Sequence, residues 1–293
     1  MAINSNAQEW LDTAEYPFEH HFLQTKNGKL HYIDEGKGEV LLFIHGTPTW
    51  SFLYRNYIKA FSNQYRCIAL DHLGFGLSDK PIDFIGTPEA HAANLEALID
   101  TLGLTNITLV VHDFGGPIGL SYAIKHASNI SRVVIFNTWL WGTKDDPDAQ
   151  KIYRILHSAL GNFLYLRTNL SPKILLKKAF HDKKKLNRQV HRQYTKPFPN
   201  KTKRYGLLKI GQSLIGSSDW YQQQWESIDT LKNIPFLILW GEKDDFIKKT
   251  NLEKWKAKLT NETICVFPSG HFVQEESFDE SLERMKHWLN QNK

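Results

Sequence analysis

The feature that most constrains the fold is the segment LVVHDFGG at 109–116, in which an apolar run ends in a turn of small residues. The apolar run predicts a buried strand, and the paired glycines predict a sharp turn into a helix. A strand, turn and helix of this kind, usually written G-x-S-x-G, carries a nucleophile at its apex. Here Asp113 takes the place of the serine, and Val111 replaces the first glycine. An aspartate before two glycines also caps helices and starts turns, so this segment alone leaves a purely structural role open.

An aspartate nucleophile changes the chemistry that such a turn supports. A serine alkoxide attacks acyl carbons, whereas a carboxylate suits displacement of a leaving group from an alkyl carbon or opening of a strained ring. Either reaction leaves the substrate attached to the enzyme as an ester. Water must then cleave that ester, so a second group that activates water is required.

Two later segments supply the missing groups. A strand-like run at 235–240 is followed by Asp244, and another at 263–267 is followed by His271. The chain order Asp, Asp, His is that of a nucleophile, acid and histidine triad, with each residue at the carboxyl end of a predicted strand. Asp245 is the alternative acid, because it is adjacent to Asp244.

The backbone donors of an oxyanion hole are predicted from a fourth segment. HGTPTW at 45–50 directly follows the strand-like residues 40–44. In folds with this turn one amide comes from the residue after the nucleophile, here Phe114, and the other from this earlier loop, here Thr47. Taken alone, HGTP is also consistent with an ordinary Gly-Pro turn.

The rest of the chain alternates between strand and helix signals. Asn-Gly at 27–28 predicts a hairpin between strand-like residues 22–24 and 30–33, and Thr87 and Gly103 bracket a predicted helix. The further predicted strands are 66–71, 107–112 and 132–137. Such alternation predicts a mostly parallel sheet flanked by helices, an α/β fold. The alternation of strand and helix signals stops over 138–228, which predicts a helical cap inserted after the sixth strand. Residues 1–137 and 229–293 are then the core domain.

Composition narrows the class of protein. With 293 residues, 41% of them hydrophobic, the chain is long enough for one catalytic domain with an insertion. Cys67 and Cys265 fall in predicted strands, which favours core positions over a disulfide or metal pair, and no metal motif occurs. The first residues predict neither a signal peptide nor an anchor, and no run approaches the roughly 20 apolar residues of a membrane span, so a cytoplasmic monomer without a membrane partner is expected.

A cluster of positive charge stands out in the predicted cap. Its members are Lys177, Lys178, Lys183, Lys184, Lys185, Arg188, Arg192 and Lys196. Such a cluster can attract an anionic ligand or surface, but the overall charge of +5 is modest and no nucleic-acid-binding motif accompanies it. A solvated outer face of the cap is therefore expected, with no nucleic-acid partner.

Nearly the whole chain resembles the haloalkane dehalogenases and their epoxide-hydrolase relatives in the α/β-hydrolase superfamily. The strings that carry the resemblance are HGTPTWSFLYR at 45–55, DHLGFGLSDKP at 71–81, VVHDFGGPIGL at 110–120 and GHFVQE at 270–275. The resemblance implies an α/β-hydrolase fold and cofactor-free hydrolysis of a small apolar haloalkane by water to an alcohol and halide. It also makes Asp113 the nucleophile, His271 the base and Asp244 the acid. Asn137 occupies a position where one dehalogenase subgroup carries its acid, but an amide cannot serve as that acid.

The chain departs from the dehalogenase pattern at the leaving-group site. Dehalogenases usually follow the nucleophile with a tryptophan whose N–H holds the halide, whereas Phe114 has no such donor. The oxyanion loop has Thr47 where some relatives have asparagine. Trp139 and Trp141, just past the sixth strand, are the candidate replacement donors.

Three other functions stay open on the sequence. An epoxide hydrolase requires cap tyrosines, for which Tyr153, Tyr194 and Tyr221 are candidates, and a β-lactone-processing relative requires the same aspartate nucleophile. A ligand receptor on the same scaffold has no need of a complete triad, so the intact set Asp113, Asp244 and His271 argues for an enzyme.

Overall fold

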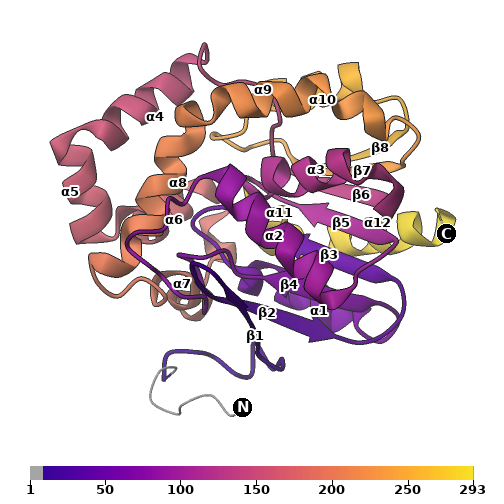
Figure 1. The fold of residues 1–293 in the computed structure, drawn as a ribbon, viewed down its shortest axis with the longest axis horizontal. Helices are drawn as coiled ribbons and strands as arrows, with labels where there is room; N and C mark the ends of the chain where they lie inside the picture. The colour runs from indigo at the N-terminus through magenta and orange to yellow at the C-terminus, as the bar shows by residue number, and fades with distance from the viewer. Residues whose placement is uncertain (1–8, 293) are drawn as a thin grey trace.

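The computed structural model describes residues 9–292, and its centre is an eight-stranded sheet (Figure 1). The strands are β1 (His21–Thr25), β2 (Gly28–Glu35), β3 (Val40–Ile44), β4 (Arg66–Leu70), β5 (Ile107–Val111), β6 (Ile130–Phe136), β7 (Phe236–Gly241) and β8 (Glu262–Phe267). Their order is β1-β2-β4-β3-β5-β6-β7-β8; β2 pairs antiparallel with β1 and β4, and every later pair is parallel. The mostly parallel sheet expected from the sequence is confirmed. Residues 1–8, part of the segment for which no leader is expected, lie outside the described residues.

Helices cover both faces of the sheet. They are α1 (Arg55–Phe61), α2 (Pro88–Leu102), α3 (Gly115–Lys125), α4 (Pro147–His157), α5 (Ala159–Thr168), α6 (Leu176–Ala179), α7 (Arg188–Thr195), α8 (Tyr205–Gly216), α9 (Ser218–Glu226), α10 (Lys249–Lys258), α11 (Val273–Glu276) and α12 (Phe278–Gln291). Among the residues that the structure describes, no helix is long and apolar enough to cross a membrane.

The alternation of side chains along the strands produces two cores. In β3, Leu42 and Ile44 contribute to the core on the face covered by α2 and α3, while Leu41 and Phe43 contribute to the core on the face covered by α1 and α12. All four side chains are buried, because a strand in the middle of a parallel sheet is covered on both faces. Cys67 in β4 and Cys265 in β8 are both free thiols.

The helix signals around α2 have the geometry that the sequence predicts. The Thr87 side chain accepts a hydrogen bond from the Ala90 amide, and Pro88 occupies the first turn, where its missing N–H costs nothing. Gly103 ends the helix with a φ of 57°, a left-handed conformation that glycine adopts without a steric penalty. α2 packs against α3, and the predicted nucleophile Asp113 lies two residues before α3 begins.

The helices α4 to α9 all lie between β6 and β7 in the chain. In Figure 1, α4, α5 and α8 form the left side of the molecule, beside the sheet, and α9 crosses the top toward α10. A small core of their own joins α4, α5 and α8 through Leu156, Leu166 and Leu208. We call residues 147–226 the inserted helices.

Candidate active site

Asp113 lies at the tip of the turn between β5 and α3. Its φ is 51°, in a region that residues other than glycine seldom adopt. The turn is tight because a Cβ on Gly115 would lie 2.2 Å from the Ile44 carbonyl oxygen, and one on Gly116 would lie 1.9 Å from Thr138 Oγ1. The Thr138 hydroxyl donates a hydrogen bond to the Asp113 carbonyl at 2.5 Å. Only small residues fit behind Asp113, so the glycine pair gives the turn its shape.

The three predicted triad residues meet at the carboxyl ends of β5, β7 and β8. His271 Nδ1 lies 2.7 Å from Asp244 Oδ2, and His271 Nε2 lies 3.7 Å from Asp113 Oδ2. The three residues are buried, with 4 to 8% of their surfaces exposed. His271 is thus in contact with both carboxylates, one on each ring nitrogen.

Asp244, and not its neighbour Asp245, faces the histidine. Asp244 Oδ1 accepts hydrogen bonds from the amides of Phe246 at 2.7 Å and Ile247 at 3.0 Å. Its Oδ2, which contacts His271, also accepts a hydrogen bond from Asn137 Nδ2 at 3.0 Å. Asp245 is exposed to solvent. The carboxylate of Asp244 is therefore fully hydrogen-bonded and fixed in orientation.

Electrostatics favour a charged His271 and partly offset the cost of burying a charged Asp113. Burial opposes a charge on His271, but the negative charge of Asp244 and its hydrogen bond, together with Asp113, outweigh this and raise the pKa of His271 above its ordinary value. Burial also raises the pKa of Asp113, and the charge of His271 and the amides of Phe114 and Thr47 act against that rise. These donors stabilise the ionised form of Asp113, which is the form that can act as a nucleophile.

The loop after β3 approaches Asp113 closely. The Thr47 amide donates a hydrogen bond to Asp113 Oδ1 at 2.7 Å, and the Phe114 amide also binds this carboxylate. A Cβ on Gly46 would lie 2.2 Å from Asp113 Oδ1, so a glycine is required for this approach. The two amides that the sequence predicts as oxyanion donors both bind the carboxylate of Asp113.

A histidine pair supports this loop. His45 Nε2 accepts a hydrogen bond from the His72 amide, and the His72 ring contacts the His45 carbonyl, both at 3.0 Å. Both rings are buried. His72 lies in the string DHLGFGLSDKP, but no spacing in the sequence indicates that it supports the oxyanion loop.

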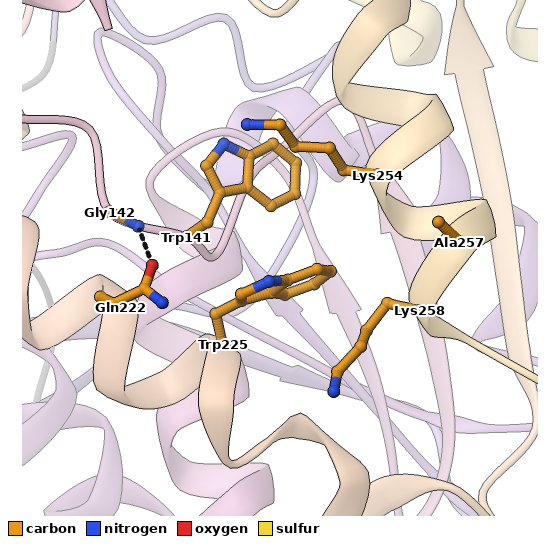
Figure 2. A pocket seen from close by; sticks show the side chains of 7 residues that line it. All are labelled: Trp141, Gly142, Gln222, Trp225, Lys254, Ala257 and Lys258. Carbon is orange, nitrogen blue, oxygen red and sulfur yellow. Dashed lines mark hydrogen bonds between the residues drawn. The ribbon is translucent and has the colours of Figure 1, made fainter. Parts of the chain in front are cut away.

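The two candidate leaving-group tryptophans lie in different places. The Trp139 ring meets the Phe114 ring edge to face, with 4.9 Å between centroids, and its buried Nε1 has no hydrogen-bond partner within residues 9–292. Trp141 instead lines a groove of about 450 Å³ together with Trp225 and Lys254, as Figure 2 shows. The Lys254 ammonium lies 4.6 Å from the centre of the Trp141 ring. Of the two, only Trp139 is next to the turn that carries Asp113.

The three tyrosines considered for an epoxide hydrolase each have another partner, although Tyr221 also packs against Trp139. Their contacts are Tyr153 with the His157 ring, Tyr194 with the Glu275 carboxylate and Tyr221 with the Ser213 carbonyl. Sequence reasoning did not single out Tyr165, in α5. Burial raises the pKa of Tyr165 to about 12, and the negative charge of Asp113 contributes to the rise. Tyr165 is therefore a tyrosine of the inserted helices that lies within the electrostatic field of the site.

Glu276 is a second residue that sequence reasoning missed. One of its carboxylate oxygens accepts a hydrogen bond from the Gly270 amide at 2.9 Å, and the other accepts one from the Asp182 amide at 2.7 Å. The His271 amide in turn donates to the Ala179 carbonyl at 2.9 Å. The loop that carries His271 is thus hydrogen-bonded to residues 179–182 of the inserted helices. We call this contact the histidine-loop clamp.

The side chains gathered here support nucleophilic displacement followed by general-base catalysis. The site combines a carboxylate held by two amides with an imidazole whose orientation is fixed by a second carboxylate. Within residues 9–292, no group of three or more His, Cys, Asp or Glu side chains is placed to hold a metal ion.

Comparisons with known proteins agree with this fold. Residues 39–278 match the family model described as alpha/beta hydrolase fold. The chain is 36% identical to a cis-3-alkyl-4-alkyloxetan-2-one decarboxylase of Shewanella oneidensis, over 96% of this chain and 91% of that protein. It is 33% identical to haloalkane dehalogenase 2 of Mycobacterium tuberculosis, over 92% of this chain and 94% of that protein.

Solved structures show the same architecture. The haloalkane dehalogenase DatA from Agrobacterium tumefaciens superimposes with a TM-score of 0.84 at 24% sequence identity, covering 94% of this chain and 97% of that one. At this level of identity the likeness establishes the fold, and it places the chain among proteins with a mostly parallel sheet and helices on both sides.

Proposed function

The chain is a haloalkane dehalogenase-like member of the α/β-hydrolase family, and on this premise we propose that it hydrolyses the carbon–halogen bond of a small apolar haloalkane through an ester on Asp113. The observation that carries the proposal is the contact of His271 with both Asp113 and Asp244 beside two amides on the Asp113 carboxylate. The alternative functions differ in the leaving group and share this machinery.

In the first step Asp113 Oδ2 attacks the substrate carbon. A C–O bond forms as the carbon–halogen bond breaks, and the bonding electron pair leaves with the halide. Because Oδ1 is hydrogen-bonded to the Thr47 amide, Oδ2 is the oxygen left for attack. The product of this step is an alkyl ester of Asp113.

In the second step His271 Nε2 takes a proton from water. The water oxygen attacks the Asp113 carboxyl carbon, and the resulting oxyanion is stabilised by the amides of Thr47 and Phe114. The intermediate then breaks to release the alkoxide, which recovers the proton from His271. Asp244 keeps the imidazole in the required tautomer and stabilises its charged form. One oxygen of Asp113 therefore comes from solvent in each turnover.

We assign residues 138–228 to a cap over this site, with 1–137 and 229–293 forming the catalytic core. Two contacts support this assignment: the histidine-loop clamp, and the packing of Trp139, in this segment, against Phe114 beside the nucleophile, with 4.9 Å between ring centroids. A cap of this kind excludes water during the first step and gives the substrate apolar surroundings.

A specific observation favours a β-lactone as the second candidate substrate. Phe114 cannot donate a hydrogen bond to a departing halide, and a relative that is 36% identical is a decarboxylase of substituted oxetan-2-ones. In an oxetan-2-one the leaving oxygen stays attached to the substrate. A site for a free anion is then unnecessary, so the loss of a halide donor would cost less.

We expect the purified protein to release bromide from 1-bromobutane, with chloride released more slowly from 1-chlorobutane because chloride is the poorer leaving group. Halide release is measured alongside turnover of 1,2-epoxyhexane and of a cis-3,4-dialkyloxetan-2-one on the same preparation. No halide from any haloalkane, together with rapid consumption of the oxetanone, would replace the dehalogenase assignment with lactone processing. Inertness toward all four substrates would reject an enzyme with this nucleophile.

Trp139 is expected to supply the N–H that Phe114 lacks. Losing a hydrogen bond to a charged group costs roughly 1.5 to 3 kcal/mol, so Trp139→Phe should lower the rate of bromide release about 10 to 150-fold. Trp141→Phe is the matched control, because Trp141 faces the groove in Figure 2, and it should leave the rate unchanged. Equal losses in the two variants would show that neither indole binds the halide and that both act through packing.

A further inference from the structure

Positive charge is concentrated in one segment of this protein. Residues 147–196 contain twelve Lys and Arg and two Asp, a formal charge of +10. The rest of the chain has 24 basic and 29 acidic residues and carries −5. The overall charge of +5 conceals this division between residues 147–196 and the rest of the chain.

The twelve cations of this segment are free to meet an external partner. They are Lys151, Arg154, Arg167, Lys173, Lys177, Lys178, Lys183, Lys184, Lys185, Arg188, Arg192 and Lys196, and all are exposed. Within residues 9–292, none of them forms an ion pair, whereas Lys and Arg elsewhere pair with Asp or Glu at many positions, such as Arg66 with Asp34. The segment therefore presents uncompensated positive charge to solvent.

Large apolar side chains are exposed in the same segment. Leu160 is 68% exposed, Phe163 56% and Ile174 55%, and Ile155 is also exposed. Leu160 and Phe163 are three residues apart in α5 and so share one side of that helix. In Figure 1, α4 and α5 form the outer left edge of the molecule. Ile155 follows Arg154 and Ile174 follows Lys173 in the chain, so exposed apolar side chains and cations alternate here, a combination that fits a partner both apolar and anionic.

We propose that these twelve cations and four apolar side chains form a basic apolar face that docks on an anionic lipid bilayer. Lysine and arginine bind the negatively charged headgroups, while leucine, isoleucine and phenylalanine enter the boundary with the acyl chains. A nucleic acid would satisfy the cations but would leave Leu160 and Phe163 in water. No helix has to span the membrane, because the face lies on the bilayer surface.

Docking would place the active site beside the lipid phase, in which apolar substrates dissolve. The basic apolar face includes Lys177, Lys178 and Lys183, which lie next to the residues of the histidine-loop clamp, Ala179 and Asp182. Apolar substrates partition into lipid, so an enzyme held at the bilayer surface meets them at a higher local concentration. The docking itself is independent of which substrate is hydrolysed.

Flotation of the full chain with vesicles tests the proposal. The protein should float with vesicles of phosphatidylcholine and phosphatidylglycerol at 7:3 in low salt, and should stay in solution with pure phosphatidylcholine. Each basic residue near an anionic surface is worth about fivefold in partitioning, so the loss of three of them in K183E/K184E/K185E should weaken binding by at least roughly a hundredfold, and the added negative charges weaken it further. L160Q/F163Q should bind about tenfold more weakly in high salt, where screening leaves the apolar contribution dominant.

The matched control changes three lysines outside the segment. K26E/K29E/K37E alters the net charge by the same amount at exposed positions around β1 and β2, and it should bind vesicles like the wild type. Far-UV circular dichroism and thermal unfolding check that every variant is folded. Failure of the wild type to float with anionic vesicles would overturn the proposal, as would equal weakening by the control or unchanged binding of L160Q/F163Q. Formation of a dimer that K183E/K184E/K185E abolishes, without flotation, would assign the face to a second copy of the chain instead.

Discussion

Replacing His271 with glutamine is expected to stop turnover after the first step and to trap the substrate on the enzyme. Glutamine cannot take a proton from water, but the nucleophile Asp113 and its amide contacts remain. Intact-mass spectrometry after incubation with 1-bromobutane should show the mass of one added butyl group, and peptide mapping should place it on Asp113. Steady-state turnover should fall by four orders of magnitude or more, in line with the loss of a triad histidine.

Two further measurements make this result specific. Asp113→Ala in the His271→Gln background should remove the adduct, because the attacking oxygen is gone. A single turnover of the wild type in ¹⁸O-labelled water should place the label in the Asp113 carboxyl group, since water attacks that carbon. An adduct on another residue, or label in the alcohol alone, would assign the nucleophile elsewhere.

Replacing Asp244 with asparagine is expected to lower turnover by about four orders of magnitude, as neutralising the acid of a triad does. The acidic side of the pH profile should also move. Activity needs neutral His271 and is lost as pH falls through the pKa of His271, which Asp244 raises. Without that carboxylate, the largest influence that raises the pKa of His271 against burial is lost, so the acid limb should shift to lower pH. The pH dependence of ester hydrolysis in a single turnover measures this shift.

The neighbouring acid provides the control. Asp245 is exposed and differs from Asp244 by one position, so Asp245→Asn should keep wild-type turnover and an unchanged pH profile. A loss of turnover confined to Asp245→Asn would show that Asp245, and not Asp244, is the acid that orients His271. Similar small losses in both variants would mean that the orientation of His271 does not depend on either carboxylate.

The triad and the sheet were predictable because each depends on local sequence patterns. Asp113, Asp244 and His271 each follow an apolar run of strand length, and a parallel sheet brings the carboxyl ends of its strands together. The order of these residues along the chain then indicates which one is the nucleophile, which the acid and which the base. The bounds of α2 were also predictable from local sequence. The Thr87 side chain caps the first turn of the helix, and Gly103 ends it by adopting a left-handed backbone conformation.

The surroundings of the triad were not predictable in this way. β6 ends at Phe136, so the regular alternation of side chains does not extend to Trp139 and Trp141, and their directions depend on packing with Phe114 and Trp225. Glu276 contacts a segment 94 residues away, and no local pattern reports such a contact.

The histidine-loop clamp ties one part of the inserted helices directly to the catalytic loop. Residues 179–182 cannot move away from the core without pulling on Gly270 and His271, and the nearby Tyr194 is held by Glu275, which also pairs with Arg55. α4 and α5 pack mainly on α8, and in the described part of the chain no hydrogen bond joins them to Gly270 or His271. The Asp148 carboxylate of α4 does pair with Lys248, in the loop that follows Asp244. A displacement of α4 and α5 would leave the hydrogen bonds of the histidine-loop clamp intact, so His271 would stay aligned while these two helices move.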